Sequence, residues 1–153
     1  MKIIFLDIDG VLNVIPQGYD KFGGIFHKHL VDNLQKIINE TGAYIVISSS
    51  WRSDGTMKEM WEHRGLPGEI IGLTPFCKSR SRGEEIQMWI DKNKKDLDLE
   101  SYCILDDDIE DIFPSQLYNY VKTSGNKDHS DRIDIGYGLT LKCAEKAIRI
   151  LNK

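Results

Sequence analysis

Short apolar runs alternate along the chain with longer segments in which apolar residues recur every three or four positions. The runs are rich in β-branched residues, a pattern typical of strands buried on both faces of a sheet. They lie at 3–6, 44–47, 70–71 and 102–105, and a final strand is expected over 117–122. The longer segments have the spacing of amphipathic helices. They lie at 29–42, 57–65, 81–90 and 140–151.

This alternation predicts an α/β fold, a doubly wound parallel sheet with helices on both faces. Gly42 and Gly65 are expected to end the first two helices. The glycine-rich segments 11–27 and 124–138 are expected to be loops, the first of them a flap beside the end of the first strand. No repeat or change of composition divides the chain, which predicts a single domain over 1–153. The last helix is expected to face inward with Leu141, Ala144, Ile148 and Leu151.

The first strand ends in two aspartates, Asp7 and Asp9, followed by Gly10. In extended chain, residues i and i+2 point the same way, so both carboxylates would face one spot. Ligands of open α/β sheets bind at the carboxyl ends of the strands. Two close carboxylates repel each other, and Mg²⁺ would relieve the repulsion. The alternatives are a turn with two solvated aspartates or a calcium loop, but Gly18 stands where a calcium loop needs an acidic residue.

The second strand runs into the polar sequence SSSWR. A hydroxyl from Ser48 or Ser49, together with the N–H groups of the following turn, can hold a phosphoryl oxygen. The alternative is that these serines only cap the next helix. Arg52 can bind phosphate through two N–H groups or can be a solvated surface residue, and Trp51 is expected to pack.

The segment KSRSRGEE places basic residues at the start of the third helix, where Ser81 and Glu84 predict a capping box. Arg82 lies in the first turn, and Lys78 and Arg80 precede it. A cation at a helix N-terminus opposes the helix dipole, so a nearby anion is expected. The alternative is a loop of solvated basic residues.

The strand at 102–105 leads directly into Asp106, Asp107 and Asp108. Three consecutive aspartates after a buried strand indicate a nearby positive charge. The alternative is a cluster that caps the short turn after it, a role that suits Asp108.

The segment FLDIDGVLN resembles the first motif, hhhhDxDG(T/V), of the haloacid dehalogenase (HAD) superfamily of phosphatases and phosphotransferases. The resemblance implies a Rossmann-like core in which Asp7 is the nucleophile and Asp9 the general acid and base. By the same resemblance Ser48 is the hydroxyl of the second motif, with Ser49 as the alternative. Arg82 fills the basic third motif in place of the common lysine, with Lys78 and Arg80 as rivals.

The resemblance also implies a magnesium site. Asp7 would bind Mg²⁺ through its carboxylate and Asp9 through its main-chain carbonyl. In the acidic fourth motif, Asp107 is the expected ligand and Asp106 its oriented partner, with Asp108 and Asp111 less favoured. The segments predicted to bind the substrate's phosphate contain Ser49, Arg52 and Lys78.

The segments ISSSWR, RGEEIQMWI, ILDDD and GLTLKCAEKAIRIL resemble the small capless HAD domain of Swiss-army-knife RNA repair proteins. The implied activity is Mg²⁺-dependent hydrolysis of a phosphomonoester through an aspartyl-phosphate, on a nucleic-acid end or a nucleotide. A small-metabolite or phosphoprotein phosphatase with the same mechanism, and a non-catalytic binding or phospho-accepting HAD module, stay open. The segments between the motifs are too short for a large cap domain.

Composition narrows the setting of the protein but not its substrate. The formal net charge of −4 gives no overall field that would attract nucleic acid. Three widely separated cysteines predict neither a zinc site nor a disulfide framework, and fit the cytoplasm. Asp7 interrupts the first apolar run, so neither a signal peptide nor a membrane span is expected there. His27 and His29 could bind a metal together, but no third ligand is evident.

Overall fold

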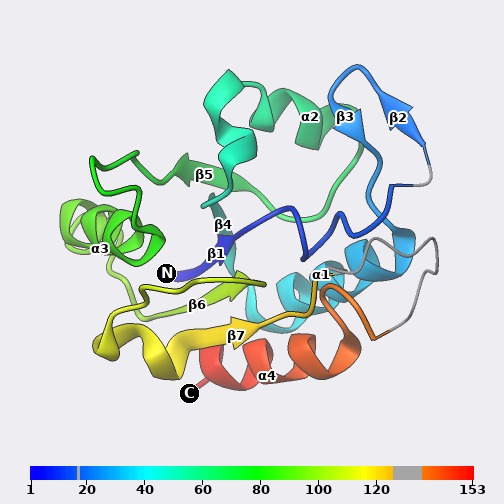
Figure 1. Cartoon of the computed structure of the whole chain (residues 1–153). Coiled ribbons are helices and arrows are strands. Elements are labelled where there is room, and N and C mark those ends of the chain that lie inside the picture. The colour runs from blue at the N-terminus through cyan, green and yellow to red at the C-terminus, as the bar shows by residue number, and fades with distance from the viewer. Residues whose placement is uncertain (17, 126–135) are drawn as a thin grey trace.

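The computed structural model of the chain describes residues 1–16, 18–125 and 136–153. Its centre is a five-stranded sheet in the order β5-β4-β1-β6-β7, with every neighbouring pair parallel. Figure 1 shows the helices arranged around this sheet. The strands are β1 (Lys2–Leu6), β4 (Tyr44–Ile47), β5 (Ile70–Leu73), β6 (Ser101–Asp106) and β7 (Tyr120–Lys122).

The helices cover both faces of the sheet, which confirms the doubly wound α/β fold. They are α1 (Lys28–Thr41), α2 (Met57–His63), α3 (Arg82–Asn93) and α4 (Leu141–Leu151). Along β1, Ile4 and Leu6 join the core beneath α1, α2 and α4. Ile3 and Phe5 face the opposite way and pack with α3. This alternation follows from the two-residue period of a strand, and it explains why β1 is apolar throughout.

Local signals set several of the helix ends. Gly42 closes α1 with a φ of +69°, and its N–H donates to the carbonyl of Ile38. The Ser81 hydroxyl accepts from the N–H of Glu84 at the start of α3. The carboxylate of Glu84 accepts from the Ser79 hydroxyl at 2.6 Å. Ser81 therefore caps α3 as predicted, but its own N–H donates to the Ser79 hydroxyl and not to Glu84, so the reciprocal bond of a capping box is not formed.

The structure corrects the expectation of a strand over 117–122. Only Tyr120–Lys122 is a strand, and Pro114–Asn119 forms the short 3-10 helix η2. Proline at the first position of η2 favours a helical turn because its φ is fixed and its missing N–H is not needed there. In α4, Leu141 is 51% exposed, so its predicted inward position is wrong. Most of the loop predicted at 124–138 lies outside the described residues.

The segment predicted as a flap contains a short antiparallel hairpin, β2 (Tyr19–Asp20) and β3 (Gly23–Gly24). Arg64, which follows α2, fastens it. The Arg64 guanidinium donates to both carboxylate oxygens of Asp20, at 2.7 and 2.8 Å, and to the main-chain carbonyls of the β3 glycines. The described residues hold no large cap domain, and none of their helices has the length and apolar character needed to cross a bilayer.

Candidate active site

Each strand of the sheet leads into a buried polar residue at its carboxyl end. In sheet order these residues are Thr74, Ser48, Asp7, Asp106 and Thr123. The register explains the row, because Leu6 of β1 pairs with Ile47 on one side and Leu105 on the other. The chain leaves β1 for β4 and later returns to β6 on the other side of β1. The centre of the row is thus the topological switch point, where open α/β sheets bind ligands.

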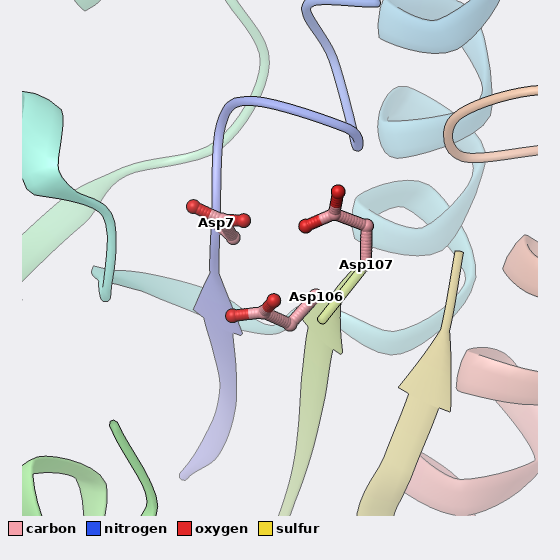
Figure 2. Close-up of side chains that lie close together, drawn as sticks. All are labelled: Asp7, Asp106 and Asp107. Carbon is pink, nitrogen blue, oxygen red and sulfur yellow. The ribbon is translucent and has the colours of Figure 1, made fainter. Parts of the chain in front are cut away.

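Three carboxylates converge at this point. Asp7, Asp106 and Asp107 each offer an oxygen, and the three oxygens lie within 4.8 Å of one another. Figure 2 shows Asp7 reaching from the end of β1 and the other two from the end of β6. Asp7 is 5% and Asp106 1% exposed, whereas Asp107 is half-buried. The two acidic segments found in the sequence therefore form one cluster.

Arg82, in the first turn of α3, supplies a positive charge to this cluster. Its Nη1 lies 3.2 Å from Asp7 Oδ1 and 2.6 Å from Asp106 Oδ2. These two carboxylates are the anions that a basic residue at a helix N-terminus is expected to have nearby. Lys78 and Arg80 are exposed, and in the described part of the chain neither forms an ion pair with these carboxylates.

The carboxylates raise one another's affinity for protons. Burial, and then the neighbouring charge of Asp106, raise the pKa of Asp7 from 3.8 to about 8. Burial and Asp106 also raise the pKa of Asp107. Burial alone would lower the pKa of Arg82, but Asp106 and Asp7 outweigh it and raise the pKa. One guanidinium therefore leaves the cluster short of positive charge.

The donor set fits a small divalent cation. Mg²⁺ prefers hard oxygen ligands and is commonly held by one or two carboxylates with substrate phosphate and water. Burial and the neighbouring Asp106 raise the pKa of Asp7, so a nearby positive charge is favourable at this point. Asp7, Asp106 and Asp107 are close enough together to share such an ion.

The Asp107 side chain lies against two glycines, Gly10 and Gly125. A Cβ atom added to Gly10, which has a φ of +83°, would lie 2.2 Å from Asp107 Oδ2. A Cβ atom on Gly125 would lie 2.5 Å from the same oxygen. The Thr123 hydroxyl donates to the carbonyl of Gly10 at 2.7 Å and ties the end of β7 to this turn. The glycine of the D-x-D-G motif thus leaves room for an aspartate almost a hundred positions later.

Asp9 lies outside the carboxylate cluster and is exposed. The side chain of Asn13 donates to Asp9 Oδ1 at 2.9 Å, and the indole N–H of Trp51 donates to Asp9 Oδ2 at 3.0 Å. Each oxygen of this carboxylate thus has its own side-chain donor.

The serines after β4 differ in their surroundings. Both are 1% exposed. The Ser49 hydroxyl accepts from the N–H of Trp51 and so caps the 3-10 helix η1 (Ser50–Asp54). The Ser48 hydroxyl is buried without a hydrogen-bond partner among the described residues. A buried, unpaired hydroxyl beside Asp7 is suited to form a hydrogen bond with a bound group.

Arg52 is buried and joins three segments of the chain. Its guanidinium donates to the main-chain carbonyls of Ser49 and Thr74, at 2.7 and 2.9 Å, and to Glu85 Oε1 at 3.1 Å. These contacts show a structural clamp between β4, β5 and α3. Its predicted role in binding phosphate stays a prediction, as does that of exposed Lys78.

Sequence patterns missed two contacts of the site. Trp51 packs as expected but also binds Asp9, and Thr123 holds the turn at Gly10. Trp51 carried one signal, since it directly follows the serines at the end of β4. Thr123 carried none, because its partner lies 113 positions away.

Comparison with known proteins identifies the family. The sequence profile of the HAD domain in Swiss Army Knife RNA repair proteins matches residues 3–128. No curated protein matches the chain at a significant level. A solved structure of a candidate HAD superfamily (subfamily III A) hydrolase from Legionella pneumophila is 15% identical, with 99% of this chain and 84% of that chain covered and a TM-score of 0.41.

The family profile spans most of the chain and includes all four motifs. The protein therefore belongs to the family of HAD domains found in Swiss Army Knife RNA repair proteins. The predicted resemblance to this family is confirmed, and the matched residues contain ISSSWR, RGEEIQMWI and ILDDD but end before GLTLKCAEKAIRIL.

Proposed function

We propose that this protein is a Mg²⁺-dependent phosphatase that hydrolyses phosphomonoesters with Asp7 as its nucleophile. The observation that carries the proposal is the cluster of Asp7, Asp106 and Asp107 with the Arg82 guanidinium, at the switch point of a HAD fold. A nucleophilic carboxylate, an acidic cation site and a phosphate-binding cation are the groups that phosphoryl transfer to an aspartate needs.

In the first step, a carboxylate oxygen of Asp7 attacks the phosphorus atom in line with the leaving oxygen. The bond from phosphorus to the leaving oxygen breaks as the bond to Asp7 forms. Asp9 donates a proton to the leaving oxygen, so that an alcohol departs. Arg82 and the unpaired hydroxyl of Ser48 bind phosphoryl oxygens beside Asp7.

In the second step, Asp9 takes a proton from water, and the water oxygen attacks the phosphorus of the aspartyl-phosphate. The bond between phosphorus and the Asp7 oxygen breaks, which releases inorganic phosphate and restores both carboxyl groups. Phosphoryl transfer depends on positioning and charge stabilisation. The rigid row of strand ends is well suited to provide that positioning.

The residues proposed to hold Mg²⁺ are Asp7 and Asp107 through their carboxylates and Asp9 through its main-chain carbonyl. Asp106 sets the position of Arg82 next to them. When bound, the ion supplies positive charge that lets an anionic nucleophile approach an anionic phosphate.

A phosphatase assay with p-nitrophenyl phosphate tests the proposal. We expect Mg²⁺-dependent hydrolysis that EDTA abolishes and that Asp7→Asn reduces to background. Asp9→Asn should lower the rate more than about 100-fold. Asp32→Asn is the matched control, because Asp32 is an exposed aspartate on α1 that pairs with Lys28, and it should keep wild-type activity. Near-normal turnover by Asp7→Asn would show that the nucleophile is assigned wrongly.

A cavity beside the site favours a nucleotide or nucleic-acid end as the substrate. It has a volume of about 620 Å³ and is lined in part by Arg52, Phe76, Lys78, Arg80 and Arg82. Arg82 also contacts Asp7, so the cavity adjoins the reacting group. Phe76 is 59% exposed, with the Arg52 guanidinium 3.8 Å from its ring centre. An exposed aromatic ring can stack on a nucleobase, and the positively charged side chains around it can bind further phosphate groups of the same substrate.

The substrate class is tested by comparing 3′- and 5′-phosphorylated oligonucleotides, nucleoside monophosphates, sugar phosphates and phosphopeptides. Phe76→Leu should raise KM for the nucleotide substrates several-fold and leave that for glycerol phosphate near wild type, since base stacking contributes about 1–3 kcal/mol. Tyr118→Leu is the control, because it removes another aromatic ring, in η2, that is 88% exposed. It should change neither of these two KM values. If Phe76→Leu changed KM equally for the nucleotide substrates and for glycerol phosphate, a small-metabolite phosphatase would be favoured. If the wild-type protein preferred phosphopeptides, a phosphoprotein phosphatase would be favoured.

A further inference from the structure

In the proposed reaction, the position of the Asp9 carboxylate depends on two other side chains. This carboxylate is exposed and stands outside the buried carboxylate cluster. An exposed aspartate samples several rotamers, whereas proton transfer needs the carboxylate within hydrogen-bond reach of the leaving oxygen. Something must therefore select one orientation of Asp9.

Two donors make this selection. Asn13 Nδ2 lies 2.9 Å from Asp9 Oδ1, and its main-chain carbonyl accepts from the N–H of Gly10. This donor belongs to the same tight turn as Asp9. The second donor, Trp51 Nε1, lies 3.0 Å from Asp9 Oδ2 and comes from η1, 42 positions away. Because the Trp51 bond crosses from β4 to β1, it fixes Asp9 relative to the rest of the site.

The Trp51 indole is itself held in place. Its ring packs against the hairpin, where a Cβ atom on Gly23 would lie 3.2 Å from it. On another side, the centre of the Phe26 ring lies 5.7 Å from the indole centre. The hairpin is in turn fastened to Arg64 through Asp20. The indole N–H therefore points at Asp9 from a packed ring rather than from a free surface side chain.

We propose that Trp51 is a positioning residue that aims the Asp9 carboxylate at the leaving oxygen of the substrate. This proposal rests on the phosphatase function proposed above. It predicts a defect that depends on the leaving group. An alkyl leaving group needs a proton from Asp9 as it departs, whereas p-nitrophenolate is stable without one. Loss of the Trp51 N–H should therefore slow alkyl phosphates more than aryl phosphates.

The test is Trp51→Phe, which keeps an aromatic ring and removes the N–H. The measured quantity is kcat/KM for glycerol phosphate and for p-nitrophenyl phosphate, because it reports transfer to Asp7 and not the later hydrolysis. We expect kcat/KM to fall about 10-fold with glycerol phosphate and less than about 3-fold with the aryl ester. The larger loss is only a part of the full contribution of general acid catalysis, because Asp9 itself is still present. In an Asp9→Asn background the same substitution should no longer change the ratio between the two substrates.

Trp61→Phe is the matched control. It keeps an aromatic ring beside Phe26 and removes an indole N–H that donates to the carbonyl of Pro67 at 2.8 Å and not to Asp9, so it should leave the substrate ratio at the wild-type value. An equal loss with both substrates, or no loss, would mean that Trp51 only packs. If the wild-type protein hydrolysed neither ester, the phosphatase function itself would fail. If its activity required Asp7 while Trp51→Phe kept the substrate ratio, only the positioning role would fail.

Discussion

Gly10→Ala is predicted to disable the site by displacing an aspartate distant in sequence. The added Cβ atom would lie 2.2 Å from Oδ2 and 2.3 Å from Cγ of Asp107. Close contacts between carbon and oxygen are about 3.3 Å, so the carboxylate must move by about 1 Å. A displacement of that size in a reacting site costs about 100-fold in rate. We therefore expect kcat/KM to fall about 100-fold and the affinity for Mg²⁺ to fall with it.

The same substitution also strains the backbone, and the two effects can be separated. Gly10 has a φ of +83°, a conformation that costs a residue with a Cβ atom about 1–2 kcal/mol. Gly42→Ala is the matched control, because Gly42 has a φ of +69° and no atom within 4 Å of an added Cβ. Both variants should lose a similar free energy of unfolding from strain, but Gly42→Ala should keep its activity and its Mg²⁺ affinity.

Urea unfolding, steady-state kinetics and Mg²⁺ titration of both variants provide the measurements. In an Asp107→Gly background, Gly10→Ala should cost no more stability than Gly42→Ala does, because the Asp107 atoms nearest the added Cβ, including the Asp107 Cβ at 2.7 Å, are absent. The reasoning would be refuted if Gly10→Ala kept kcat/KM within about 3-fold of wild type while showing the strain of Gly42→Ala. It would also be refuted if Gly42→Ala lost as much activity as Gly10→Ala.

Three other predictions follow from the charged groups. Burial and Asp106 raise the pKa of Asp7 to about 8, so protons compete with Mg²⁺ below that pH. The Mg²⁺ concentration for half-maximal thermal stabilisation should rise about fivefold from pH 8 to 7 and about ninefold from pH 7 to 6; a midpoint independent of pH would contradict the raised pKa. Arg64, through its hydrogen bonds, lowers the pKa of Asp20 to about 2, so this pair stabilises the fold above about pH 4 and its contribution is lost as the pH falls through 2. Urea unfolding of Asp20→Asn should therefore show a stability loss at pH 7 that shrinks below pH 4, and a constant loss would count against the ion pair. Arg52→Ala should lower the free energy of unfolding by about 3 kcal/mol or more, because it leaves the Glu85 carboxylate buried without its counter-charge. Unchanged stability with weaker phosphate binding would instead support the predicted substrate role of Arg52.

The positions of Asp7, Ser48 and Asp106 could be predicted because each ends an apolar run, and parallel strands end at one edge of the sheet. The lateral order of those strands could not be predicted from local patterns. It depends on which strands pair, and the pairing of β1 with both β4 and β6 places Asp7 between the other two. The sequence thus indicated the edge on which the site lies but not its arrangement.

Side chains that act across long separations were harder to predict. Arg52 was expected to bind phosphate or face solvent, because arginine is rarely buried unless it is paired. Its partner Glu85 lies 33 positions further along, in a helix whose sequence reads as an ordinary acidic first turn. Similarly, the place of Trp51 after the serines of β4 put it near the site, but its N–H bond to Asp9 spans 42 positions and has no local signal. These contacts depend on tertiary packing rather than on local propensity.

The structure also gives a physical reason to prefer Asp107 over Asp106 as the metal ligand, which the run of three aspartates left open. Both oxygens of Asp106 accept hydrogen bonds, Oδ2 from Arg82 at 2.6 Å and Oδ1 from the N–H of Asp108 at 2.9 Å. Asp106 is therefore suited to orient the guanidinium beside Asp7. Asp107 lies near Asp7 in the same cluster, and burial and the charge of Asp106 raise its pKa. A divalent cation between Asp7 and Asp107 would relieve that repulsion without breaking the bonds that hold Arg82.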